Sequence, residues 1–196
     1  MSRQATAAAL GFRVKSGWAC AVLLAGPVAT PRVLDRCRVE LSDQEVPHSQ
    51  QPYHAAMGKL EEDPATIRAR TQVVQRAAGT SVAAMIEGYH LAGHRLRRAG
   101  LVVGSQIDPA SIANPHIRAH ALEGRLFRTV LQEALETHGL SCAVHLERKV
   151  YADATDVLGL AEANLKRALA DLGRSFGGPW RAEEKLASLA AWMALA

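Results

Sequence analysis

Two histidines and a carboxylate occupy a helix face that ought to be packed. The segment 114–139 reads NPHIRAHALEGRLFRTVLQEALETHG and has helical periodicity. On a helical wheel, His116 and His120 lie about 40° apart, and Glu123 falls about 20° to the other side of His116. The apolar stripe of the helix lies in the same sector and comprises Phe127, Val130, Leu131 and Ala134. The three ionisable residues therefore continue this stripe into the first two turns.

Three interpretations of these residues are open. His116, His120 and Glu123 have the side-chain chemistry to hold a single metal ion. Alternatively, His116 and the free backbone N–H groups at the helix start, together with Arg13 or Lys15, form a pocket for an anion. The third interpretation is a hydrogen-bonded network that closes the end of a sheet and has no chemical role.

The N-terminal part of the chain predicts a three-stranded antiparallel meander. The expected strands cover 7–14, 18–25 and 32–41, and the turn Lys15-Ser16-Gly17 separates the first two. The apolar stretch at 18–25 also has the character of a secretory signal, but the long mixed leader before it favours a strand. A polar loop follows over 42–63. Its HSQQPYH sequence offers Tyr53 and His54 to a nearby site, although most loop residues of this kind are simply solvated.

The rest of the chain predicts helices that alternate with strands. The N-cap Asp63 and Pro64 begin a helix that is expected to break or kink at Gly79-Thr80-Ser81 and to reach about Arg98. Later expected elements are a strand within 97–107, the helix 115–138, a strand at 140–152, a helix at 153–172 and a final helix at 180–195. This order predicts a single α/β domain over 1–196, with a mixed five-stranded sheet covered by helices on both faces.

This order of elements resembles the ribonuclease H-like superfold, in the topology of Holliday-junction resolvases. The stretch LGFRVKSGWACAVLL contains the glycine (Gly11), the tight turn and the second strand of that pattern. The resemblance implies two divalent metals, held by carboxylates at the ends of strands one and four and on a later helix.

The sequence departs from that pattern at most of the carboxylate positions. Arg13 stands where the first strand should carry an acid, and a cation there repels a metal. Strand four ends in Ser105 and Gln106, with Asp108 slightly beyond. The late segment keeps Asp153 and Asp156 before a small-apolar helix. The sequence therefore predicts a ribonuclease H-like domain from which most metal-binding carboxylates are absent.

Composition is that of an ordinary globular protein with a modest positive charge. The 196 residues are 48% hydrophobic and carry a net charge of +4, which permits anionic partners without requiring them. The three cysteines, Cys20, Cys37 and Cys142, are far apart in the sequence. This spacing and their odd number indicate reduced thiols in a cytoplasmic protein. No apolar run is long enough to span a bilayer, so we expect no membrane partner.

The leading functional hypothesis is a non-catalytic or degenerate domain that binds nucleic acid or a phosphorylated ligand. Its expected binding residues are Arg13, Lys15, Ser16, His116 and Arg118. The enzymatic alternative is a metal-dependent nuclease or phosphate-ester hydrolase with a rearranged site and a divalent metal cofactor. Its expected residues are Asp108, His120, Glu123, Asp153 and Asp156. A third hypothesis is a protein-interaction domain, which requires an exposed apolar patch.

Overall fold

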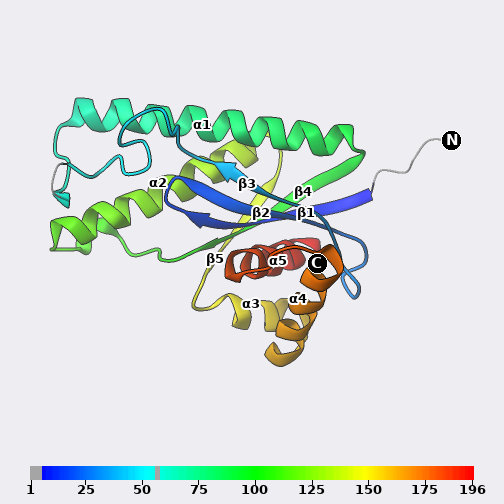
Figure 1. Cartoon of the computed structure of the whole chain (residues 1–196). Coiled ribbons are helices and arrows are strands. Elements are labelled where there is room, and N and C mark those ends of the chain that lie inside the picture. Colours follow the sequence, from blue (N-terminus) through cyan, green and yellow to red (C-terminus); the bar gives the residue numbers. More distant parts are fainter. Residues whose placement is uncertain (1–5, 56–57) are drawn as a thin grey trace.

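The computed structural model describes residues 6–55 and 58–196, and a five-stranded mixed sheet lies at its centre (Figure 1). The strands are β1 (Thr6–Lys15), β2 (Trp18–Ala25), β3 (Arg32–Glu40), β4 (His94–Val103) and β5 (Ser141–Leu146), in the spatial order β3-β2-β1-β4-β5. The first three form an antiparallel meander, whereas β4 runs parallel to β1 and β5 runs parallel to β4. The carboxyl ends of β1, β4 and β5 therefore meet at one edge of the sheet.

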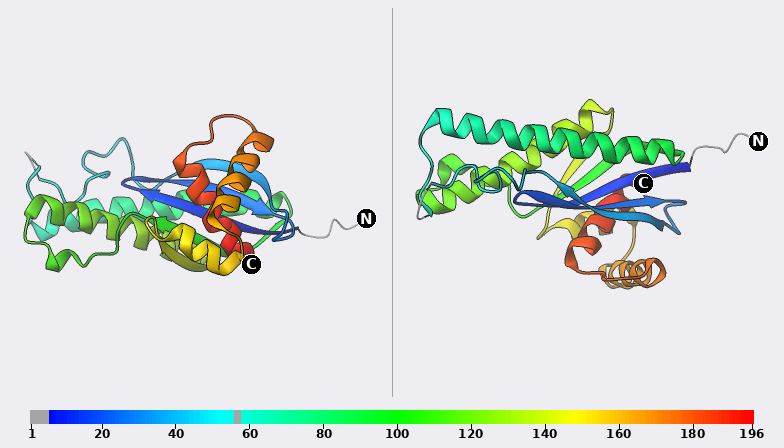
Figure 2. Two further views of the ribbon diagram at one scale, coloured as in Figure 1. Left: turned by 90° about the horizontal axis from the view of Figure 1, so that it is seen from below. Right: turned by 45° about the horizontal axis from the view of Figure 1, so that its top comes forward.

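Helices cover both faces of this sheet (Figure 1). The helices α1 (Pro64–Leu91) and α2 (Pro115–Thr137) lie on one face. The helices α3 (Val150–Leu158), α4 (Glu162–Phe176) and α5 (Ala182–Leu195) lie on the other, where α5 crosses the strands (Figure 2). A short 3-10 helix, η2 (Pro109–Ser111), stands between β4 and α2. None of the helices in the described ranges is long and apolar enough to cross a membrane.

Alternation along the central strands separates two apolar cores. Leu10 and Phe12 of β1 face α1 and α2, where they pack with Ile86 and Phe127. The other face of the sheet packs against α5, whose Trp192 is buried. The fold class predicted from the sequence, a mixed five-stranded sheet between helical layers, is confirmed, and 18–25 is a strand of that sheet.

The predicted break in the first long helix is wrong. Helix α1 runs through Gly79 for 28 residues, because its buried residues Val74, Ala78, Val82 and Ile86 recur every four positions across the supposed break. The helix also ends at Leu91 rather than near Arg98. Gly93, with a φ of 84°, turns the chain into β4 there.

Two predictions in the C-terminal third are also wrong. The strand expected over 140–152 stops at Leu146, and a helix already begins at Val150, a buried residue that packs against α5 instead of continuing the sheet. The single helix expected over 153–172 is two helices. Gly159 separates them with a left-handed φ of 66°, which ends α3 as a glycine cap does.

Candidate functional site

A cleft of about 780 Å³ opens at the carboxyl ends of β1 and β4, between the strand ends and α2. Ligands of α/β sheets usually bind at such an edge. The ends of β1 and β4, each with the residue that follows it, contribute residues 13–16 and 103–104. The start of β2 contributes Trp18, and the segment that leads into η2 contributes 105–109. Helix α2 supplies the remaining wall with His120, Ala121, Gly124, Arg125, Phe127 and Arg128.

The cleft carries more positive than negative side chains. Arg13, Lys15, Arg125 and Arg128 line it, and Asp108 is the carboxylate among its lining residues. Arg125 is exposed and Arg128 is half-buried, and within residues 6–55 and 58–196 neither forms an ion pair. These two arginines, three residues apart on α2, are therefore available to an anion in the cleft.

The two strand cations are already engaged by protein groups. Arg13 is only 7% exposed, donates to the carbonyl of Val14 at 2.6 Å, and pairs with the carboxylate of Glu147. Lys15 lies 3.4 Å from a carboxylate oxygen of Glu183, at the start of α5. The pKa of Glu183 is lowered because its carboxylate accepts a hydrogen bond from the backbone N–H of the same residue. The charge of the Lys15 ammonium adds to this shift. The positive charges of Arg13 and Lys15 are thus each paired with a carboxylate.

The residues at this edge do not fit a two-metal carboxylate centre. The Arg13 guanidinium fills the position of the first acid and holds Glu147, a carboxylate from the end of β5. The strand expected to reach residue 107 ends at Val103, and the loop after it offers Ser105 and Gln106, which carry no charge. Asp153 bonds to His145 instead, with 3.0 Å between the carboxylate and Nδ1, and Asp156 is exposed on α3. No two-metal chemistry follows from these side chains.

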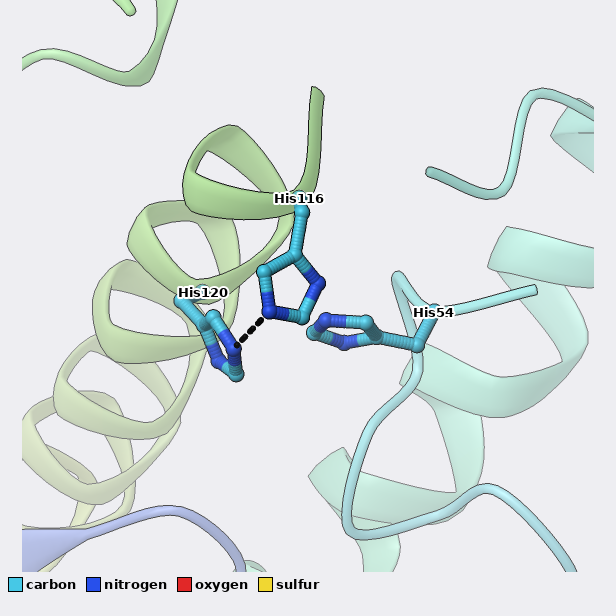
Figure 3. Close-up of side chains that lie close together, drawn as sticks. All are labelled: His54, His116 and His120. Carbon is cyan, nitrogen blue, oxygen red and sulfur yellow. Dashed lines mark hydrogen bonds between the residues drawn. The ribbon is translucent and has the colours of Figure 1, made fainter. Parts of the chain in front are cut away.

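A three-histidine cluster lies beside the cleft (Figure 3). His116 and His120 project from the first turns of α2, and His54 reaches them from the loop before α1. One ring nitrogen of each histidine lies within 4.8 Å of those of the other two. The Nε2 atoms of His116 and His120 are 3.2 Å apart, and His120 also lines the cleft.

Glu123 contacts two histidines of this cluster. Its carboxylate is fully buried, accepts a hydrogen bond from Nδ1 of His54 at 2.7 Å, and lies 3.6 Å from Nδ1 of His120. Burial raises the pKa of Glu123, while the hydrogen bond and charge of His54 oppose that shift. The carboxylate therefore orients the ring of His54 through a hydrogen bond and faces the ring of His120.

The structure brings together some of the predicted site residues and separates others. Arg13, Lys15, Ser16 and His120 line one cleft, and His116, His120 and Glu123 belong to one cluster. His116 and Arg118 do not line the cleft. Nδ1 of His116 bonds to the carbonyl of Gly58, and Nε of Arg118 donates to the carbonyl of Ile112. Asp153 and Asp156 lie on α3, across the sheet from α2.

Sequence reasoning missed two features of the site. Arg125 was not among the predicted binding residues, and its three-residue spacing from Arg128 on one helix was the available signal. His54 was a weak candidate whose default interpretation was a solvated loop residue, yet it is buried against Glu123. No local pattern distinguishes it from other loop histidines, because its partner is 69 residues away.

The fold has known structural relatives, although the sequence matches no protein-family profile and no curated protein. The structure of RuvC from Thermus thermophilus aligns over 95% of this chain and 92% of its own, with a TM-score of 0.57 and 9% identity. The same protein in complex with Holliday junction substrate aligns with a TM-score of 0.57, 9% identity and coverage of 95% and 90%. A Ppx/GppA family member from Aquifex aeolicus aligns over 79% of this chain and 40% of its own, with 13% identity and a TM-score of 0.36.

The RuvC comparison establishes the fold. The chain has the ribonuclease H-like fold that the order of its elements predicted. An identity of 9% carries the likeness no further than the fold. The chemistry of this chain has to be argued from its own side chains.

Proposed function

We propose that this domain binds the phosphate groups of nucleic acid, or of another phosphorylated ligand, in the cleft at the carboxyl ends of β1 and β4. The observation that carries the proposal is the pair Arg125 and Arg128 on the cleft wall, neither of which has a carboxylate partner among the described residues. The planar guanidinium group of arginine can donate two parallel hydrogen bonds to phosphate oxygens, and its positive charge complements theirs. The location also agrees with the crevice where open α/β sheets take their ligands.

The remaining cleft residues have distinct roles in this proposal. Lys15 and Ser16 stand at the end of β1 and offer an ammonium and a hydroxyl to the same anion. Arg13 is held by Glu147 and contributes its charge from below rather than a direct contact. His116 and Arg118 are assigned no direct phosphate contact, because protein carbonyls engage both side chains.

The proposal concerns binding without the two-metal reaction. The RuvC comparison includes a complex with Holliday junction substrate, which makes branched DNA the first nucleic acid to test. The electrostatic argument itself does not distinguish branched DNA from a duplex, a single strand or a small phosphate ester. Each of these therefore has to be offered separately.

The test is fluorescence anisotropy of labelled four-way junction, duplex and single-stranded DNA, with ATP and inorganic phosphate as competitors. The double variant Arg125→Ala/Arg128→Ala should weaken binding at least about tenfold and reduce the salt-dependence slope by about two. The matched control is Arg95→Ala/Arg97→Ala, which removes two exposed arginines at the opposite end of the sheet. Equal losses in both double variants, or no binding by the wild type, would refute the proposal.

One observation favours a second candidate, a metal-dependent phosphate-ester hydrolase. His120 belongs both to the cleft and to the histidine cluster, so an ion held by the cluster would stand at the margin of the cleft. Asp108 and Glu123 are near that margin, whereas Asp153 and Asp156 are on the other face of the sheet. Release of p-nitrophenolate from bis(p-nitrophenyl) phosphate, with and without added zinc or manganese, tests it.

A protein-interaction domain remains a third hypothesis. The large exposed apolar side chains of the described residues include Leu91, Ile107, Ile117 and Val157, which belong to four different segments. A partner surface of this kind requires a contiguous patch. The cleft has a defined place and chemistry, and it carries the proposal instead.

A further inference from the structure

We propose that His54, His116 and His120 form a zinc site in which all three imidazoles bind the ion through Nε2 and Glu123 orients two of the rings. The inference goes beyond phosphate binding and does not depend on it. It rests on the directions in which the ring nitrogens face, the separation of those nitrogens, and the burial of His54 and Glu123 (Figure 3).

The hydrogen-bond partners place a proton on Nδ1 of two histidines. Nδ1 of His116 lies 3.0 Å from the carbonyl oxygen of Gly58, which can only accept. Nδ1 of His54 lies 2.7 Å from a Glu123 oxygen, which accepts when the carboxylate is ionised. A neutral imidazole with its proton on Nδ1 presents a lone pair at Nε2. Both Nε2 atoms are therefore free to act as metal ligands.

His54 supplies an independent observation. Its side chain is 6% exposed, and Nε2 is a buried polar atom that has no hydrogen-bond partner among the described residues. A buried ring nitrogen without a partner costs free energy, so such atoms usually serve another purpose. The ring points toward His116 and His120 (Figure 3), with ring centroids 5.2 and 4.5 Å away.

The separation of the helix ligands fits a tetrahedral ion. The Nε2 atoms of His116 and His120 are 3.2 Å apart. Two nitrogens bound to tetrahedral zinc at 2.0–2.1 Å are about 3.3 Å apart, by simple geometry. The spacing of four residues on a helix is also that of a common pair of zinc histidines.

A metal-free network of three neutral imidazoles satisfies these groups less well. If Nε2 of His116 is a lone pair, His120 has to donate to it from its own Nε2. The neutral ring of His120 then has a lone pair at Nδ1, which faces a Glu123 oxygen 3.6 Å away. An ion bound at Nε2 removes this conflict, because His120 then carries its proton on Nδ1, where it faces the carboxylate.

The proposed coordination leaves one position open. Zinc takes four ligands, and the three imidazoles supply three of them. His120 is 49% exposed and lines the cleft, so the fourth position faces solvent on the cleft side. Three protein ligands with an open position are characteristic of catalytic rather than structural zinc sites.

The test is zinc binding to the chelator-stripped full-length protein, followed by competition with a chromophoric zinc indicator. We expect one zinc per chain, and a loss of affinity of at least about 100-fold in His116→Ala and in His120→Ala. Both side chains are exposed, so these variants should fold. The matched control is His90→Ala, an exposed histidine at the far end of α1.

Cobalt provides a second readout that does not depend on affinity. Co²⁺ in a tetrahedral site gives intense visible absorption, and we expect that spectrum from the wild type and not from His54→Ala. Glu123→Gln should weaken zinc binding by about 10- to 100-fold while keeping the cobalt spectrum tetrahedral. An unchanged affinity in His116→Ala and His120→Ala, or no binding by the wild type, would show that the histidines form only a hydrogen-bonded network.

Discussion

Gly11 of β1 and Gly100 of β4 are register partners in the sheet, and α5 lies directly on both. A Cβ atom at Gly11 would be 1.9 Å from the carbonyl oxygen of Ala187, and one at Gly100 would be 2.6 Å from that of Ala190. These obstacles are helix backbone, which cannot rotate away as a side chain can. The two glycines therefore set how closely the last helix approaches the sheet.

We predict that Gly11→Ala lowers the free energy of unfolding by at least about 2–3 kcal/mol, because the helix must move to admit one methyl group. The measurement is urea unfolding followed by circular dichroism. The control is Gly79→Ala in α1, where the new methyl group meets nothing within 4 Å. That variant should be more stable by about 0.5–1 kcal/mol. Destabilisation by both variants would mean that the close packing of α5 is not the cause.

The pair of Arg13 and Glu147 is asymmetric in burial. The side chain of Arg13 is 8% exposed, whereas that of Glu147 is 45% exposed. We expect Arg13→Ala to lower the free energy of unfolding by about 2–3 kcal/mol, since packing and a bond to Val14 are lost along with the ion pair. Glu147→Gln should lower it by less than about 1 kcal/mol, because water screens an exposed partner. Thermal unfolding of the two variants side by side measures this difference, and equal losses would contradict it.

Ionisation of Cys20 makes the free energy of unfolding depend on pH in the alkaline range. Burial, with a smaller contribution from Glu184, raises the pKa of its thiol to about 12. Folding favours the neutral thiol, so this stabilisation is complete below pH 9 and is lost as the pH rises toward 12. The wild type should lose about 1 kcal/mol from this group between pH 8 and pH 10. In Cys20→Ala that part of the loss should be absent, and urea midpoints at the two pH values provide the comparison.

The pattern of residues in the sequence was sufficient to predict the sheet. It was not sufficient to predict every helix boundary. Strand residues 18–25 were predicted as the structure has them, because the apolar run is bounded by Gly17 and by Gly26-Pro27. The break expected at Gly79 does not occur, because tertiary packing of Val82 and Ile86 outweighs a local helix-breaking preference. The break at Gly159 was overlooked, although the same residue type there adopts a left-handed conformation.

The candidate site was predictable only where its residues share an element. His116, His120 and Glu123 could be grouped from helical spacing, and the structure places them in one cluster. His54 enters that cluster through chain topology, which brings the loop before α1 against α2. The helical wheel also could not show that Glu123 is fully buried while His116 and His120 are exposed.

Arg70 anchors the loop that delivers His54, and this anchor makes a final prediction. From α1 its Nη1 donates to the carbonyl of His54 at 3.0 Å and lies 3.3 Å from a carboxylate oxygen of Glu61. We expect Arg70→Ala to weaken zinc binding about tenfold without removing a ligand, because the loop must then be ordered at the moment of binding. Arg68→Ala, an exposed neighbour on the same helix, is the matched control and should bind zinc as the wild type does. The zinc-indicator competition assay measures both. If Arg70→Ala also retains wild-type affinity, the loop is held by its contact with Glu123 alone. If both variants weaken binding equally, the loss reflects the general positive charge of α1 rather than the position of His54.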